Sequence, residues 1–230
     1  MNDRFQFRRF LVRQDQCAMK VGTDGVLLGA WATAAVNEVL SVLDIGTGTG
    51  LVALMMAQRF DKAHIVGVEL DHNAAMQAME NAADSEFADR ITVVEAPLQS
   101  FSTDSKFDAI VCNPPFFTHS LQCPDEQRTM ARHANTLNSH DLMTCSAALL
   151  AQGGELSVII PCEAKGSYDY EASMAGLFIS RICWVRTKSN SAPKRVLLAY
   201  SNTVPNGLDT SRLVIGDDKY RAMTRDFYLK

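Results

Sequence analysis

The sequence has 230 residues, of which 47% are hydrophobic, 21% charged and 8% aromatic, a composition that excludes a disordered chain. The length suits one large α/β domain or two small ones. A formal net charge of -4 and a pI near 5.7 exclude a protein whose entire surface is basic and which binds nucleic acid by charge alone.

Membrane and metal-binding classes are also disfavoured. No run of about 18 uncharged apolar residues occurs, and residues 1–7 lack the apolar core of a signal peptide. We therefore expect a cytoplasmic protein that does not contact a membrane. The six cysteines form no CxxC pair, so we expect reduced thiols and no metal site. They are Cys17, Cys112, Cys123, Cys145, Cys162 and Cys183.

Short β-branched segments alternate with helical patterns along most of the chain, which indicates a parallel sheet covered by helices. The expected strands are residues 39–45, 64–69, 91–95, 109–112, 155–160, 178–185 and 195–201. Leu51, Leu54, Met55 and Gln58 recur at helical spacing, and residues 73–81 are rich in good helix formers. The polar segment 188–194 is too short for a crossover helix, so the last two strands should form an antiparallel hairpin.

These elements predict a single α/β domain of Rossmann type. The expected sheet has seven mostly parallel strands, with the hairpin at its C-terminal end and helices on both faces. We divide residues 1–230 into a basic N-terminal arm (1–21), a catalytic core (22–205) and a C-terminal tail (206–230), and we expect a monomer.

Charge is unevenly distributed along the chain. Residues 61–108 hold ten acidic residues against three basic ones, whereas residues 181–200 hold five basic residues and no acid. The N-terminal 20 residues are also basic, with five bases against two acids. Two interpretations fit: solvated charges scattered over the surface, or a basic face that binds RNA if the two basic segments meet beside Asn113.

A glycine-rich turn follows the first expected strand. Asp44-Ile45-Gly46-Thr47-Gly48-Thr49-Gly50 leads directly into the helical pattern that begins at Leu51. Glycine permits close backbone approach, and the N-terminus of a helix offers free N–H groups. About 20 residues later the next strand ends in Glu69, whose carboxylate is placed to accept hydrogen bonds from ribose hydroxyls. Loop and acid together predict a nucleotide-type cofactor.

The spacing separates two cofactor classes. A dinucleotide fingerprint requires glycine at position 51, where this chain has Leu51. The carboxylate of Asp44 would repel a pyrophosphate but attract the sulfonium and ammonium groups of S-adenosylmethionine. Charge therefore favours S-adenosylmethionine over a nicotinamide dinucleotide.

The segment 44–50 resembles motif I of the class I S-adenosylmethionine-dependent methyltransferases, and Glu69 lies where that family has its ribose-binding acid. The resemblance implies that Asp44, Gly46, Gly48 and Glu69 hold the cofactor and that Ala96 lies near its adenine. The family often has an acid at the position of Ala96, and the neighbouring Glu95 is the alternative contact.

The strand 109–112 is followed by Asn113-Pro114-Pro115-Phe116-Phe117. Proline keeps this segment extended and places it at the carboxyl edge of the sheet, where α/β proteins bind ligands. The side-chain amide oxygen of Asn113 and the carbonyl of Pro114 can accept the two N–H groups of an exocyclic amine, and Phe116 can stack on the base. The product nitrogen is strongly acidic, so the reaction needs no dedicated general base. The segment resembles the amino-methyltransferase motif, whose members modify adenine N6, cytosine N4, guanine N2 or a glutamine amide.

The chain as a whole resembles the bacterial methyltransferases that place N6-methyl on adenine 37 of valine tRNA. The matching segments are 19–25 with 28–31, 44–50, 113–117, 131–133 and 224–230. The resemblance implies a tRNA substrate whose adenine is flipped into a pocket at Asn113. A glutamine N5-methyltransferase acting on a protein, an rRNA amino-methyltransferase and a non-catalytic S-adenosylmethionine-binding protein remain alternatives.

Two segments have two interpretations each. Residues 19–31 either close over the cofactor, with Thr23 or Asp24 hydrogen-bonding it, or form a turn that caps a helix whose face carries Leu27, Leu28 and Trp31. Residues 128–133, with two arginines and His133, either contact RNA phosphates or form an exposed polar loop.

Overall fold

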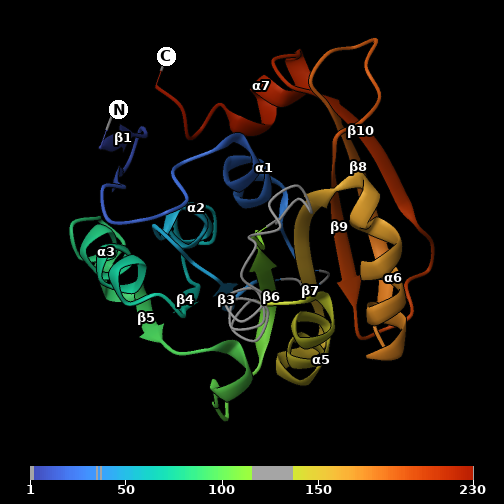
Figure 1. Ribbon diagram of the computed structural model, residues 1–230, viewed down its shortest axis with the longest axis horizontal. Helices are drawn as coiled ribbons and strands as arrows, with labels where there is room; N and C mark the ends of the chain where they lie inside the picture. Colours follow the sequence, from blue (N-terminus) through green and yellow to red (C-terminus); the bar gives the residue numbers. More distant parts are fainter. Residues whose placement is uncertain (1–2, 35, 37, 116–136, 230) are drawn as a thin grey trace, which may run out of the picture.

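The computed structural model describes residues 3–34, 36, 38–115 and 137–229. Its centre is a sheet of eight strands in the order β10-β8-β9-β7-β6-β3-β4-β5, seen from right to left in Figure 1. The strands are β3 (Ser41–Ile45), β4 (His64–Glu69), β5 (Ile91–Glu95), β6 (Phe107–Cys112), β7 (Leu150–Pro161), β8 (Phe178–Arg186), β9 (Arg195–Ser201) and β10 (Asp209–Val214).

Helices cover both faces of the sheet and divide the core in two. One cluster of buried side chains includes residues of α1 (Thr23–Trp31), α2 (Leu51–Arg59), α3 (His72–Ala83) and α7 (Asp218–Thr224). A second cluster lies under α5 (Ser139–Leu149) and α6 (Lys165–Met174). The described residues also form three short 3-10 helices: η1 (Ala88–Arg90), η2 (Leu98–Ser100) and η3 (Cys162–Ala164). This arrangement confirms the predicted α/β class.

Strand pairing brings the predicted site to one edge of the sheet. β3 pairs in parallel with β4 on one side and β6 on the other, so the carboxyl ends of all three lie together. β9 pairs antiparallel with both β7 and β8, which confirms the predicted hairpin. The residues that follow β3, β4 and β6 are therefore neighbours in space although they lie far apart in the chain.

The predicted count of seven strands is wrong by one in this sheet. β10, within the segment set apart as a tail, pairs in parallel with β8. Only one of its six residues, Leu213, is buried, so this edge strand lacks the alternation that reveals a half-buried strand. The N-terminal arm also forms a small separate sheet of β1 (Arg4–Gln6) and β2 (Leu11–Arg13).

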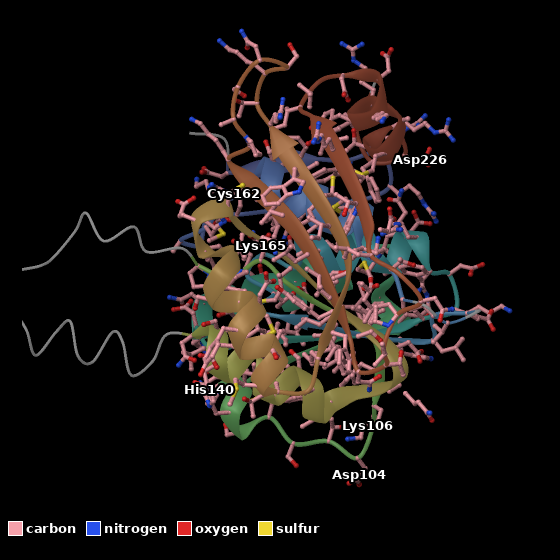
Figure 2. All side chains as sticks on the ribbon, turned by 90° about the vertical axis from the view of Figure 1, so that its right-hand side faces the viewer. Asp104, Lys106, His140, Cys162, Lys165 and Asp226 are labelled. Atoms are coloured by element: carbon pink, nitrogen blue, oxygen red, sulfur yellow. The ribbon has the colours of Figure 1, made fainter. Side chains whose placement is uncertain are left out.

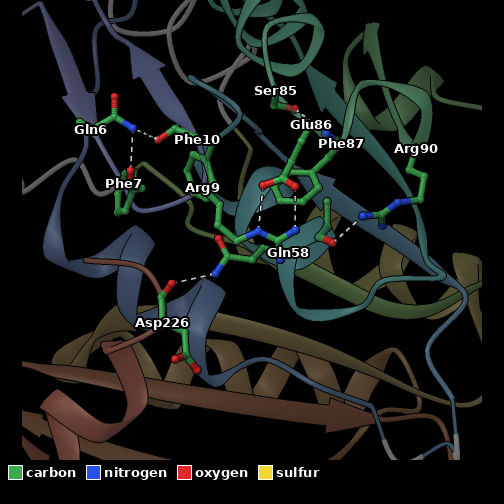
Figure 3. A network of polar contacts seen from close by, with 11 residues as sticks. Gln6, Phe7, Arg9, Phe10, Gln58, Ser85, Glu86, Phe87, Arg90 and Asp226 are labelled. Carbon is green, nitrogen blue, oxygen red and sulfur yellow. Dashed lines mark hydrogen bonds and ion pairs between the residues drawn. The ribbon is translucent and has the colours of Figure 1, made fainter. Parts of the chain in front are cut away.

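The two ends of the chain pack on each other and on the core. Phe7 and Phe10 are fully buried and stack with their ring centroids 4.8 Å apart, and Phe7 also stacks on Tyr228. Figure 3 shows the polar contacts nearby, including the amide of Gln58, which donates to the carbonyl of Asp226 at 2.9 Å. The arm and the C-terminal segment therefore belong to the folded core.

Two observations bear on the expected class of protein. Within the described part of the chain, no helix has the length and apolar character needed to span a bilayer. Cys17, Cys112, Cys145, Cys162 and Cys183, the five cysteines that the structure describes, form no disulfide with one another.

Candidate functional site

The loop between β3 and α2 depends on its glycines. Gly46, Gly48 and Gly50 have φ angles of +67°, +56° and +79°, a left-handed backbone that other residues rarely adopt. The amides of Gly46 and Thr47 donate to the carbonyl of Val68 in β4, at 2.8 and 3.1 Å. The loop is thereby fixed against the neighbouring strand, with its backbone exposed toward the carboxyl edge of the sheet.

Asp44 supports this loop from beneath. Its carboxylate is buried and accepts hydrogen bonds from the hydroxyl of Thr47 at 2.6 Å and the amide of Ala53 at 3.0 Å. The same oxygen, Oδ2, accepts both bonds. Burial raises the pKa of Asp44 to about 7, and the negative charge of Glu69 adds a smaller rise. Asp44 therefore links the end of β3, the glycine loop and the first turn of α2.

Glu69 lies beside the loop, as predicted. Its Oε2 accepts a hydrogen bond from the amide of Gly48 at 2.9 Å, and its Oε1 accepts from the amides of Leu70 and Asp71 at 2.9 and 3.0 Å. Three backbone donors thus fix the orientation of the carboxylate. Since a carboxylate offers about four acceptor positions, one on Oε2 remains for a hydroxyl of a ligand.

Asn113 follows β6 on the other side of the loop. The pairing of Cys112 with Ile45 places Asn113 next to Gly46 across the sheet edge. Its side-chain nitrogen lies 3.8 Å from the sulfur of Met19, a residue of the N-terminal arm. Phe116 lies outside the described residues, so its predicted stacking role stays a prediction.

These residues surround one cavity of about 470 Å³, within the range of about 300–1,000 Å³ typical of small-molecule sites. The predicted residues among its lining are Gly46, Gly48, Glu69, Ala96, Asn113, Pro114 and Pro115. Asp44 is not among the described lining residues, so direct contact between its carboxylate and a cofactor stays a prediction.

The cavity has a further wall, of which only Met19 belongs to a segment expected to close over the cofactor. Cys17, Ala18 and Met19 of the N-terminal arm line it. The buried amide of Gln77 in α3 holds the preceding residues: it accepts from the amide of Gln16 at 3.1 Å and donates to the carboxylate of Asp15 at 2.9 Å.

Asn81, one turn further along α3, holds the base of the same segment. Its side chain accepts from the amide of Arg13 and donates to the carbonyls of Arg13 and Thr49, all at 2.9 Å. Two buried amides in one helix were the available sequence signal, but their partners in the arm lie more than 60 positions away.

The segment at the start of α1 has a structural role. Thr23 is the first residue of α1, and no side-chain hydrogen bond caps that helix. The carboxylate of Asp24 forms an ion pair with Arg195 at the start of β9, at 2.8 Å. Neither Thr23 nor Asp24 is among the described residues that line the cavity.

The lining chemistry distinguishes between cofactors. Glu69 and Asp71 contribute carboxylates, whereas no lysine or arginine occurs among the described lining residues. Such a set does not suit the pyrophosphate of a dinucleotide, which needs positive charge or free N–H groups. It fits a nucleoside with a ribose and a cationic group, and the apolar side chains of Val68 and Leu98 suit a flat base.

Comparison with known proteins agrees with this site. The family model for the methyltransferase small domain matches residues 26–183. A tRNA1(Val) (adenine(37)-N6)-methyltransferase of Phocaeicola vulgatus is 46% identical over 234 residues, with 99% of this chain and 98% of that protein covered.

Solved structures show the same fold. A predicted O-methyltransferase of Agrobacterium tumefaciens superimposes with a TM-score of 0.66 at 19% identity, covering 89% of this chain and 96% of that one. A glycopeptide N-methyltransferase in complex with S-adenosylmethionine gives 0.59 at 13% identity, covering 81% and 96%. These findings confirm the resemblance predicted from the motifs. The chain belongs to the methyltransferase small-domain family and, within it, to the family of the tRNA1(Val) (adenine(37)-N6)-methyltransferases.

Proposed function

We propose that the protein transfers a methyl group from S-adenosylmethionine to the N6 amine of adenine 37 in valine tRNA. The name of the 46% identical relative supports this substrate. The observation that carries the proposal is the shared cavity: Asn113 and Pro114 line the same space as Gly46, Gly48 and Glu69. An amine acceptor site and a nucleoside site therefore adjoin each other.

The cofactor half of the cavity is built by β3, β4 and β5. S-adenosylmethionine, when bound, supplies a methyl group on a positively charged sulfur. The remaining acceptor position on Oε2 of Glu69 takes a ribose hydroxyl, and Gly46 and Gly48 let the backbone approach closely. Ala96, which follows β5 and lines the cavity, lies beside the adenine. Asp44 fixes the loop that makes this approach.

The substrate half lies at the end of β6. The side-chain oxygen of Asn113 and the carbonyl of Pro114 accept the two N–H groups of the adenine amine, which turns the nitrogen lone pair toward the methyl group. Pro114 and Pro115 keep this segment extended, because proline fixes its own φ and restricts the residue before it. Phe116 stacks on the face of the base.

The positive charge that develops on the methylated nitrogen is stabilised at the same acceptors. When the nitrogen bonds the methyl carbon, the carbon–sulfur bond breaks and its electron pair stays on sulfur, so the leaving group would be the neutral thioether S-adenosylhomocysteine. The nitrogen becomes positively charged, and the oxygen of Asn113 stabilises that charge through its hydrogen bond. The nitrogen then loses one proton to solvent and becomes neutral. No histidine is needed as a base.

The test is mass spectrometry of nucleosides from tRNA incubated with the protein and isotopically labelled S-adenosylmethionine. We expect labelled N6-methyladenosine, mapped to position 37 of valine tRNA by nuclease fragmentation. A label on guanine, on cytosine or on a protein glutamine would contradict the proposal, as would absence of any label.

We further propose that the enzyme works as a monomer, without a metal ion, in the cytoplasm. Methyl transfer to an amine held by two acceptors requires no Lewis acid. Light scattering of the active enzyme tests the monomeric state. Activity measured in excess chelator tests whether a metal ion is required. A dimer, or loss of activity on chelation that added metal restores, would contradict them.

A further inference from the structure

Acidic and basic residues collect at opposite ends of the sheet. Residues 61–108, which include β4, α3 and β5, hold ten acids against three bases. Residues 181–229, which include most of β8 together with β9, β10 and α7, hold nine bases against four acids. The strand order places the two groups at opposite ends, with the cavity strands β3 and β6 between them (Figure 1). A protein of net charge -4 thus has a positive end.

Three of the five basic residues of the N-terminal arm are ion-paired. Arg9 pairs with Glu86 and Arg13 pairs with Asp84, both at 2.8 Å, and Lys20 lies 3.8 Å from Asp3 (the first pair is drawn in Figure 3). Acids that follow α3 therefore compensate Arg9 and Arg13, whereas the described residues form no recorded ion pair with Arg4 or Arg8. The arm has less free positive charge than its five bases suggest, and its part in a basic face stays a prediction.

The turn between β8 and β9 differs from the arm. Residues 186–195 include Arg186, Lys188, Lys194 and Arg195 and contain no acid. Lys188 and Lys194 are exposed, and the structure records no ion pair for either ammonium group with any residue it describes. Two uncompensated positive charges therefore stand on one short turn.

Strand direction places this turn at the edge that holds the site. β8 and β7 are both antiparallel to β9 and hence run in the same direction, so β8 ends at the carboxyl edge. The amide of Cys162, directly after β7, donates to the carbonyl of Lys194 at 3.3 Å. In Figure 2 the turn stands at the same end of the molecule as Cys162, whereas Lys106, before β6, lies at the opposite end.

An ion pair ties the turn to the wall of the cavity. Arg195 bonds the carboxylate of Asp24 in the first turn of α1. Asp24 follows shortly after Met19, which lines the cavity and contacts the amide of Asn113. The basic turn is thus held in a fixed relation to the residue that receives the target amine.

We propose that the β8–β9 turn is a docking surface for the phosphate backbone of the RNA substrate, with Lys188 and Lys194 each bound to a phosphate. This inference rests on the proposed function and adds the place where the RNA lies. Lysine binds phosphate as a point charge and needs no fixed geometry, which suits a mobile side chain on a turn. The acidic end repels the same polyanion, so the RNA lies across the carboxyl edge toward β10.

The experiment compares the natural protein with the double variant Lys188→Gln/Lys194→Gln. KM for valine tRNA transcript is measured at salt concentrations between about 50 and 200 mM. At about 200 mM salt, we expect the KM of the double variant to be about tenfold higher than that of the natural protein. We also expect the slope of log KM against log salt concentration to be smaller by about 2 in the variant, one unit for each lost phosphate contact. The Kd for S-adenosylmethionine is expected to stay within twofold.

The matched control is Lys62→Gln/Lys106→Gln. These two lysines are also exposed, but they precede β4 and β6 and so lie at the opposite edge of the sheet. The control is expected to keep the natural KM and salt slope. Equal salt slopes for both double variants would overturn the docking surface. Natural protein that methylates no tRNA would instead overturn the proposed function, so the two failures are distinguishable.

Discussion

Gln77 offers a direct test of the wall formed by residues 17–19. Its side chain is fully buried in α3, and both of its hydrogen bonds go to the arm, to the amide of Gln16 and the carboxylate of Asp15. No residue of the glycine loop, of β6 or of the described cavity lining bonds to it. The change Gln77→Ala therefore removes support for the wall and leaves the other three sides of the cavity in place.

The magnitude follows from the two bonds. Each contributes about 1 kcal/mol, so the change weakens docking of the segment by about 2 kcal/mol, or about 30-fold in the local equilibrium. If the cofactor binds only when the wall is in place, its apparent Kd is the intrinsic Kd divided by the fraction of protein in which the wall is docked. Because Asn81 still holds the base of the segment, we expect Kd for S-adenosylmethionine to rise between about threefold and thirtyfold.

Asn202→Ala is the matched control for this measurement. Asn202 also makes two bonds to backbone groups, accepting from the amide of Gly153 at 3.0 Å and donating to the carbonyl of Ala151 at 2.9 Å. These contacts lie where β7 begins and β9 ends, at the edge opposite the cavity. Isothermal titration and thermal unfolding of both variants should show a similar loss of stability but a raised Kd only for Gln77→Ala. Equal Kd values would refute the reasoning.

Two further predictions concern the residues at the sheet edge. Asn113→Ala should abolish turnover and leave the Kd for S-adenosylmethionine within about threefold, because only the substrate amine loses an acceptor. Single-turnover kinetics measures the rate of methyl transfer, and calorimetric titration measures the Kd. An equal loss of rate and of cofactor affinity would contradict the role assigned to Asn113. Asp44→Asn keeps an oxygen for the donors Thr47 and Ala53 but removes the buried charge. Since burial raises the pKa of Asp44 to about 7, above its unfolded value near 4, the natural carboxyl stabilises the fold below about pH 4 and loses that contribution as the pH rises to about 7. Between about pH 4 and pH 7, the variant should therefore gain stability over the natural protein in thermal unfolding, by up to about 4 kcal/mol. A stability difference that does not change with pH would oppose this prediction.

The parts of the fold that could be predicted are those with a strong local pattern. β3, β4 and β6 are short apolar segments that end in residues of distinct chemistry, and the parallel pairing of such strands brings their ends together. The positions of Gly48, Glu69 and Asn113 around one cavity follow from that rule. For these three residues, the structure adds the order of the strands in the sheet.

The wall of the cavity could not be predicted because its contacts join distant parts of the chain. Nothing near Met19 indicates that it reaches Asn113, which lies 94 positions away. Likewise, Gln77 and Asn81 look like ordinary polar helix residues until the arm is placed on α3. β10 could not be predicted for a different reason. It is an exposed edge strand with almost no buried side chains, so it lacks the hydrophobic pattern of a strand.

Asp44 has a structural role in addition to the cofactor role that its motif predicts. A carboxylate beside a glycine loop attracts a cation through space, but this one is buried beneath the loop and receives two hydrogen bonds from it. Its main effect in the structure is to shape the loop. A preference for a cationic cofactor can also come from Glu69 and Asp71, which line the cavity.

The net charge of the chain does not describe the local charge at either end of the sheet. A charge of -4 disfavours RNA binding only if it is spread evenly, and the strand order of this sheet separates it into an acidic end and a basic end. Because screening limits electrostatic attraction to roughly 8 Å at physiological salt, a phosphate near the β8–β9 turn experiences Lys188 and Lys194 rather than the molecule as a whole. The acids near β4 and β5 then act on the same RNA by repulsion and restrict its orientation. An acidic protein of this design can therefore bind RNA in one orientation, whereas a uniformly basic one would bind it in many.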